Sequence, residues 1–215
     1  MNYKSKAFRL HGNHCLQIFV PKVGNENCIL FLLFLLTLSF SFPCFCYASN
    51  GSLIRNKDYA FRINIPQGFH VKQGRGPNVK VNAVTNNGES IVVIAKTLSK
   101  EFKRINFDRM SDADIQQYIK NISIQYQNTF PGMQIVESKI TYLSNHRAAM
   151  TIFITPVNSI RGSATLKQFT IETILDGKLF NVGCSAPIET YDRFYQTFLE
   201  TVVSFWIEDK SWYTK

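Results

Sequence analysis

The sequence predicts an α+β fold in which two helices pack on an antiparallel sheet of six to seven strands. Segments in which apolar residues recur at every second position form two blocks, and an amphipathic helix follows each block. Short turns join most of these segments, so consecutive strands are expected to pair antiparallel. The two helices then need a sheet face on which to bury their apolar sides.

Residues 1–48 have the pattern of an export signal. An uncharged apolar stretch from Cys28 to Tyr47 follows a segment that carries Lys4, Lys6, Arg9 and Lys22. The small residue at the end of this stretch predicts signal-peptidase cleavage between Ala48 and Ser49. An uncleaved membrane anchor is the alternative, because the apolar run approaches the roughly 20 residues that cross a bilayer. In either case the rest of the chain faces outward.

A polar, turn-rich segment at residues 49–58 is expected to be a flexible lead-in to the folded domain. From Tyr59 to Ile65 apolar and polar residues alternate, which is the period of a strand with one buried face. Two further strands are expected to begin at Val79 and Ser90. The Asn-Gly pair between them is typical of a tight β-hairpin turn.

The first helix is expected to begin after Ser111, whose hydroxyl is a good N-cap. Acidic residues follow it and suit the positive end of the helix dipole. The apolar residues that stand at helical spacing predict the buried side of this helix, namely Ile115, Tyr118, Ile119, Ile122 and Tyr126. Pro131 and Gly132 then predict its end.

Period-two alternation returns at Met133 and continues through four segments, which predicts an antiparallel meander. The Asp-Gly pair at residues 176–177 is the clearest turn signal in the chain. After Pro187, which suits the first turn of a helix, apolar residues recur every three or four positions. This pattern predicts a terminal helix that ends near Trp206, followed by a tail at residues 209–215.

Cys184 is the one cysteine of five that lies outside the predicted signal, so the mature chain offers it no disulfide partner. In the last strand it shares one side with Phe180 and Val182, and the preceding strand offers Phe169 and Ile171 to match. Packing in the core is therefore its expected role. A catalytic thiol would instead need an exposed sulfur and a histidine within hydrogen-bond reach.

The opening "FRINIPQGF" and the closing "DGKLFNVGCSAPIETYDRFYQTFLETVVSF" resemble the PsbP-like family, which shares its fold with a Ran-binding nuclear import factor. The residues that carry this resemblance are Pro66, Gly68, Phe69, Gly177, Leu179, Cys184, Ala186, Pro187, Tyr191 and Phe205. The resemblance implies a PsbP-like domain over residues 59–208, built as an α/β/α sandwich. It also implies an exported bacterial protein without an assigned activity.

Two loops and one hairpin turn contain the candidate binding residues. Arg75 and Arg161 each stand beside glycine, where backbone N–H groups and a guanidinium together can hold an anion. His146 is the candidate for a surface metal site shared with a carboxylate. The histidines and acids of the mature chain lack the spacing of zinc or calcium motifs, so no cofactor is predicted.

Composition and motifs favour a binding protein over an enzyme. The formal net charge is +9, but the basic residues stand singly or in pairs, so no nucleic-acid partner is expected. The sequence contains no motif of serine hydrolases, P-loop proteins or zincins.

We therefore expect a non-catalytic, periplasmic or secreted accessory protein that docks an envelope protein partner. A small-molecule or metal-binding module is the alternative, and a thiol enzyme that uses Cys184 comes third. The membrane is contacted only if the N-terminal segment stays uncleaved.

Overall fold

The computed structural model describes residues 51–208 except positions 75, 160 and 161. All of them belong to one compact unit of the chain, Ser49–Lys215. Three predicted features lie outside the described residues, namely the signal at residues 1–48, its cleavage site at Ala48 and Ser49, and the tail at residues 209–215.

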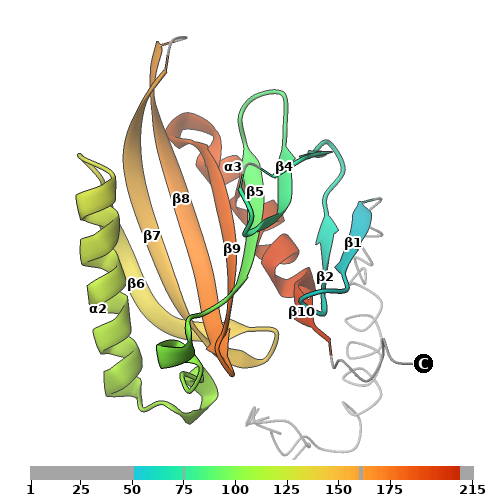
Figure 1. Ribbon diagram of the computed structural model, residues 1–215. Coiled ribbons are helices and arrows are strands. Elements are labelled where there is room, and N and C mark those ends of the chain that lie inside the picture. Colours follow the sequence, from blue (N-terminus) through green and yellow to red (C-terminus); the bar gives the residue numbers. More distant parts are fainter. Residues whose placement is uncertain (1–50, 75, 160–161, 209–215) are drawn as a thin grey trace, which may run out of the picture. The chain divides into compact units, whose positions relative to one another are not determined.

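Two antiparallel sheets make up the domain (Figure 1). The main sheet consists of β3 (His70–Lys72), β4 (Val79–Val84), β5 (Ser90–Thr97), β6 (Gln134–Leu143), β7 (His146–Ser159), β8 (Gly162–Leu175) and β9 (Lys178–Pro187). These seven strands follow the order β3-β4-β5-β9-β8-β7-β6. The small sheet consists of β1 (Ser52–Asn56), β2 (Phe61–Ile65) and β10 (Trp206–Ile207), with β2 in the middle.

Two α-helices of the described residues cover opposite faces of the main sheet. They are α2 (Asp112–Thr129) and α3 (Ile188–Ser204), and two short 3-10 helices, η1 (Lys100–Phe102) and η2 (Phe107–Arg109), precede α2. In Figure 1, α2 lies in front of the sheet along β6 and β7, whereas α3 lies behind it. We call these two sides the α2 face and the α3 face. The predicted α+β class is confirmed.

The turn and cap signals of the sequence form as predicted. Ser111 Oγ accepts a hydrogen bond from Asp114 N at 3.2 Å, and Asp114 Oδ2 accepts one from Ser111 N at 3.3 Å. This reciprocal capping box starts α2. Asp176 and Gly177 both have positive φ angles, 46° and 75°, as the tight turn between β8 and β9 requires.

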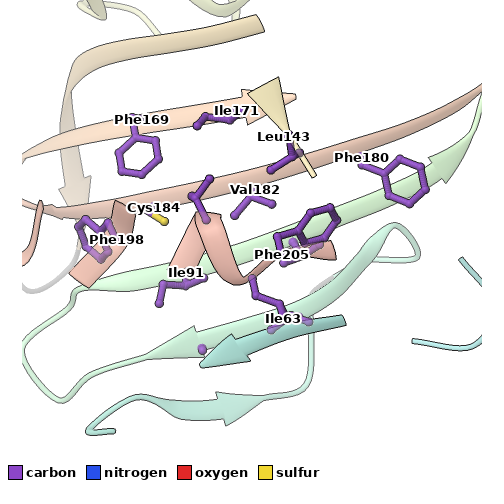
Figure 2. Packing of buried hydrophobic residues seen from close by; sticks show 14 of the residues in the cluster. Ile63, Ile91, Leu143, Phe169, Ile171, Phe180, Val182, Cys184, Phe198 and Phe205 are labelled. Atoms are coloured by element: carbon purple, nitrogen blue, oxygen red, sulfur yellow. The ribbon is translucent and has the colours of Figure 1, made fainter. Parts of the chain in front are cut away.

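The main core lies on the α3 face and connects both sheets. It is built from aromatic and aliphatic side chains of β2, β5, β8, β9 and α3, among them Phe61, Ile63, Ile91, Phe169, Val182, Cys184, Phe198 and Phe205. Figure 2 shows the labelled members of this core pointing toward one another, among them Ile63, Ile91, Phe169, Val182, Cys184, Phe198 and Phe205. A smaller cluster under α2 consists of Phe107, Ile115, Ile119, Ala149, Ile174 and Leu179.

The prediction of a flexible lead-in at residues 49–58 is wrong for Ser52–Asn56. These residues form β1, which pairs with β2 and places Ile54 opposite Ile63. Ile54 packs against the main core. The backbone ladder and this burial therefore outweigh the polar, turn-rich composition of the segment.

The terminal helix ends at Ser204, slightly before the predicted end near Trp206. Trp206 and Ile207 instead pair with Arg62 and Phe61 of β2 as the short strand β10. The first predicted strand consequently belongs to the small sheet, and the main sheet reaches seven strands because His70–Lys72 adds an edge strand, β3.

Candidate functional site

A pocket of about 310 Å³ opens on the α2 face of the main sheet. The helix lies over β6 and β7, and the strands β5, β9 and β8 continue beyond it (Figure 1). These three strands form the floor of the pocket, and the end of α2 with the loop after it forms one wall. We call this cavity the sheet pocket.

Gly183 lies at the centre of the floor. On the neighbouring strands it stands opposite Val92 of β5 and Thr170 of β8. A Cβ atom at this position would meet Thr170 Cγ2 at 3.5 Å and Asn181 Oδ1 at 3.7 Å, which are ordinary contacts. The absence of a side chain at Gly183 therefore leaves space at the centre of the pocket. A larger side chain at this position would fill the pocket rather than clash with the strands.

Polar groups flank this glycine along β9. Asn181 and Ser185 lie two residues before and after Gly183, so all three face the same side of the strand. Ser185 Oγ is 2.7 Å from Ser90 Oγ of β5. The floor thus has a polar line through its middle, which is uncommon on a half-covered sheet face.

A buried carboxyl, Glu172, adjoins the polar line. Glu172 is 5% exposed, and its two oxygens accept hydrogen bonds from Tyr118 Oη and Asn181 Nδ2, both at 3.0 Å. Burial raises the pKa of Glu172, and the two hydrogen bonds offset part of this effect. Because Tyr118 belongs to α2, the triad Tyr118–Glu172–Asn181 also ties the helix to the sheet.

Apolar side chains form the walls. The rings of Tyr126 and Phe153 lie with centroids 5.7 Å apart, and Phe130 and Met133 continue the wall beyond the end of α2. Thr155, which also lines the pocket, has a buried hydroxyl oxygen without a hydrogen-bond partner among the described residues. A buried hydroxyl left unpaired by its own chain is one sign of a site that receives a polar group from outside.

The sheet pocket is electrically neutral. None of the fifteen described residues that line it is an aspartate, glutamate, lysine, arginine or histidine. Burial raises the pKa of Tyr126, and the nearby Glu172 adds to this effect, so its phenol is neutral as well. The arrangement suits an uncharged molecule with an apolar body and few polar groups.

His146 lies away from this pocket, at the β6–β7 turn. Its Nδ1 is 2.7 Å from Asp108 Oδ2, and Asp108 Oδ1 accepts a hydrogen bond from Arg147 N at 2.9 Å. Partial burial would raise the pKa of Asp108, but these two partners outweigh it and leave that pKa below its ordinary value. The contact fastens η2 to the hairpin.

The predicted pairing of His146 with a carboxylate is thus present, but no third ligand joins it. Within the described residues, no group of three or more His, Cys, Asp and Glu side chains could hold a metal ion. His146 as a binding residue stays a prediction. The other two candidates, Arg75 and Arg161, lie outside the described residues.

Cys184 packs in the core as predicted. It is 1% exposed, stands opposite Phe169 on β8 and lies near Phe198 of α3 (Figure 2). Burial raises the pKa of its thiol, so the sulfur stays protonated. This environment is the opposite of the one that activates a cysteine nucleophile.

Sequence reasoning missed the sheet pocket, although its polar floor left a signal. The parity that places Cys184 with Phe180 and Val182 leaves Asn181 and Gly183 on the other side of the last strand, and Ser90 is predicted only as the start of another strand. Each residue by itself is typical of a solvent-facing position. Only the pairing of β5, β9 and β8 brings them to one place.

The comparisons with known proteins bear on the fold. No family model matches this sequence, and no curated protein matches it. A solved structure, cyanobacterial PsbP (CyanoP) from Synechocystis sp. PCC 6803, has a TM-score of 0.52 and 14% identity, and the match covers 74% of this chain and 93% of that chain. The chain has a PsbP-like fold. This confirms the resemblance that the opening and closing segments indicated.

Two other structures share less of this PsbP-like geometry. LpqN of Mycobacterium tuberculosis, described as involved in cell envelope biogenesis, is 13% identical with a TM-score of 0.44, over 76% of this chain and 88% of its own. PA94 of Pseudomonas aeruginosa, a protein of unknown function and putative regulator by its description, is 10% identical with a TM-score of 0.43, over 72% of this chain and 94% of its own.

Among the described residues, neither α-helix is long and apolar enough to cross a membrane.

Proposed function

We propose that this chain is a non-catalytic exported binding protein that holds a small molecule in the sheet pocket. The observation that carries the proposal is an open, uncharged cavity of about 310 Å³ with glycine at the centre of its floor. Small-molecule sites are typically concave, largely apolar and about 300 Å³ or larger. From the sequence we expected a protein that docks an envelope partner, with a small-molecule or metal-binding module as the alternative. The pocket favours the small-molecule alternative.

Two features support binding rather than catalysis. Cys184 adjoins the pocket between Gly183 and Ser185, but it is 1% exposed and packs in the main core on the α3 face. The carboxyl of Glu172 already accepts hydrogen bonds at both oxygens, so it is poorly placed to take a proton from a ligand. Export is supported by the signal-like pattern of residues 1–48.

The proposal predicts that filling the floor abolishes binding. The purified chain is titrated with N-phenylnaphthylamine, an uncharged apolar dye whose fluorescence rises when it leaves water. In Gly183→Leu the added side chain occupies the pocket, so we expect the dye to bind about tenfold more weakly or not at all, a loss of about 1.4 kcal/mol or more.

A matched control adds the same side chain elsewhere. Thr97→Leu places leucine at an exposed position at the end of β5, outside the residues that line the pocket. This variant should bind the dye as the parent chain does. Equal dye binding by the parent chain, Gly183→Leu and Thr97→Leu would contradict the proposal.

Docking of an envelope protein remains a second candidate because large apolar side chains are exposed on the small sheet and at the nearby end of α3. Leu53 is 52% exposed, Trp206 is 41% exposed, and Val203 at the end of α3 is 82% exposed. The pairings Leu53 with Asn64 and Trp206 with Arg62 put Leu53 and Trp206 on the side of the small sheet that faces away from the core. Tryptophan beside arginine is common at protein interfaces.

This second candidate is tested by capture from the native organism. A chain tagged at its carboxyl end is crosslinked in cells, and recovered envelope proteins are compared between the parent, Trp206→Ala and Thr97→Ala. A partner that docks on the small sheet should be recovered less well with Trp206→Ala alone. Equal recovery with all three would exclude that face as the contact.

A further inference from the structure

We infer that the sheet pocket selects an uncharged molecule that presents an O–H or N–H donor to Asn181 Oδ1 above Gly183. The inference rests on the proposed function and adds the chemical class of the ligand. It arises from the orientation of one amide group, which the buried triad of Tyr118, Glu172 and Asn181 determines.

Asn181 is held with its NH₂ group toward Glu172. Asn181 Nδ2 donates a hydrogen bond to Glu172 Oε2 at 3.0 Å, so the amide presents its NH₂ group to the carboxyl. Tyr118 donates to the other carboxylate oxygen and keeps Glu172 in place. Asn181 Oδ1 consequently turns toward the position above Gly183, 3.7 Å from where a Cβ atom would stand.

The acceptor is therefore offered over the one floor residue that has no side chain. Gly183 leaves room for a ligand atom beside Asn181 Oδ1, whereas Val92 and Thr170 on either side raise the floor. Asn181 is 7% exposed, so a hydrogen bond made there is shielded from water. A ligand without a donor would leave this acceptor unpaired.

Charged ligands are disfavoured by the same surroundings. The lining residues offer no cationic side chain that could neutralise an anion, and the Glu172 carboxyl stands directly behind Asn181. A cation meets no free carboxylate, because both Glu172 oxygens are occupied and Glu172 does not line the pocket. Burial of an uncompensated charge is costly, so the pocket selects for neutrality.

Three probes of similar shape test this inference by displacement of N-phenylnaphthylamine. Naphthol carries a donor, methylnaphthalene replaces the hydroxyl with a methyl group, and naphthoate carries a negative charge. We expect naphthol to displace the dye at about fivefold lower concentration than methylnaphthalene, as for one additional hydrogen bond. Naphthoate should need about tenfold more than naphthol.

Two variants separate a positioning role of the triad from a purely structural one. In Glu172→Gln the new amide can donate to Asn181 Oδ1, so Asn181 no longer has to present its oxygen to the pocket. In Gly183→Ala the Cβ atom stands beside Asn181 Oδ1 and obstructs the approach of a donor while the triad stays intact. Both variants should reduce the preference for naphthol over methylnaphthalene to about onefold, whereas Thr97→Ala should keep it at about fivefold.

The outcomes distinguish this inference from the proposed function. If all three probes displace the dye equally from the parent chain, or if both variants keep the preference for naphthol, the inference is overturned and the small-molecule pocket stands. If the dye and the probes do not bind at all, the proposed function fails first. Should Glu172→Gln not fold, the ratio measured in Gly183→Ala decides the matter, because this variant adds only ordinary contacts.

Discussion

The two faces of the main sheet are made by the same strands and filled in opposite ways. On the α3 face, β9 contributes Phe180, Val182 and Cys184, all of which are buried in the main core. On the α2 face the same strand contributes Asn181 and Gly183 to the floor of a pocket. Polar groups on a covered strand cost stability unless they are paired. Their concentration on the α2 face fits the proposed binding role of that face, whereas the α3 face holds the main core.

Truncation of one aromatic residue on each face is expected to have very different effects on stability. Phe198 of α3 is fully buried among Phe69, Phe169 and Tyr191, whereas Phe130 at the pocket wall is 46% exposed. Phe198→Ala should lower the free energy of unfolding by about 3–5 kcal/mol. Phe130→Ala should lower it by less than about 1 kcal/mol, because the side chain is already half in water.

Urea denaturation measures both changes, provided that the dependence on urea concentration stays the same. Equal losses for Phe198→Ala and Phe130→Ala would show that the α2 face carries as much of the core as the α3 face. The claim that the α3 face contributes most of the stability would then be wrong.

Smaller changes in stability are expected from substitutions at two neighbouring residues of β9, Cys184 and Gly183. Cys184→Ala removes a buried sulfur from the α3 face and should cost about 1 kcal/mol of stability, with dye binding unchanged. Gly183→Ala acts on the α2 face and should leave stability within about 1 kcal/mol, since alanine suits a strand better than glycine. Only Gly183→Ala should change the ligand preference.

The thiol provides an independent check of the same residue. In the folded chain Cys184 should not react with a water-soluble disulfide reagent, and it should react once urea unfolds the chain. Rapid reaction of the native protein, or loss of dye binding in Cys184→Ala, would place the sulfur at the pocket instead of in the core.

The smallest expected effect is a pH dependence that belongs to Glu172. Because burial raises its pKa in the folded chain, the folded state keeps a proton at pH values where the unfolded state has lost it. Stability from this group therefore falls as the pH rises above the ordinary value of 4.5, and levels off above the folded-state pKa. In Glu172→Gln this slope should be absent.

The measurement compares urea midpoints of the parent chain and Glu172→Gln at a series of pH values. The difference between the two curves isolates Glu172, because other titrating groups such as Asp108 are common to both. Parallel curves would mean that the carboxyl is less enclosed than the triad implies.

Local signals in the sequence were sufficient for most of the fold. The capping box at Ser111, the Asp-Gly turn at residues 176–177 and the alternation in β6 to β9 each act over a few residues, so they could be identified one at a time. The burial of Cys184 also followed from strand parity, because its neighbours Phe180 and Val182 are unambiguously apolar.

The small sheet and the pocket could not be predicted in this way. β1 depends on its ladder to β2, and β10 has only two residues, so neither has a pattern long enough to recognise. The pocket depends on residues of five strands or helices and a loop, and on the register that brings Ser185 beside Ser90. From the sequence alone, a polar residue on a strand is taken to face solvent. Only the structure shows that α2 leaves part of its sheet face uncovered, so that such residues line a pocket there.

Helix α2 has fewer buried residues than α3. Two buried residues of this helix, Ile115 and Ile119, and the phenol of Tyr118 hold it against the sheet, whereas α3 is set into the main core. Elements with few buried apolar contacts open at lower free energy than the whole domain. We therefore expect amide hydrogens of α2 to exchange with solvent before those of β9, by a local opening that leaves the seven strands paired.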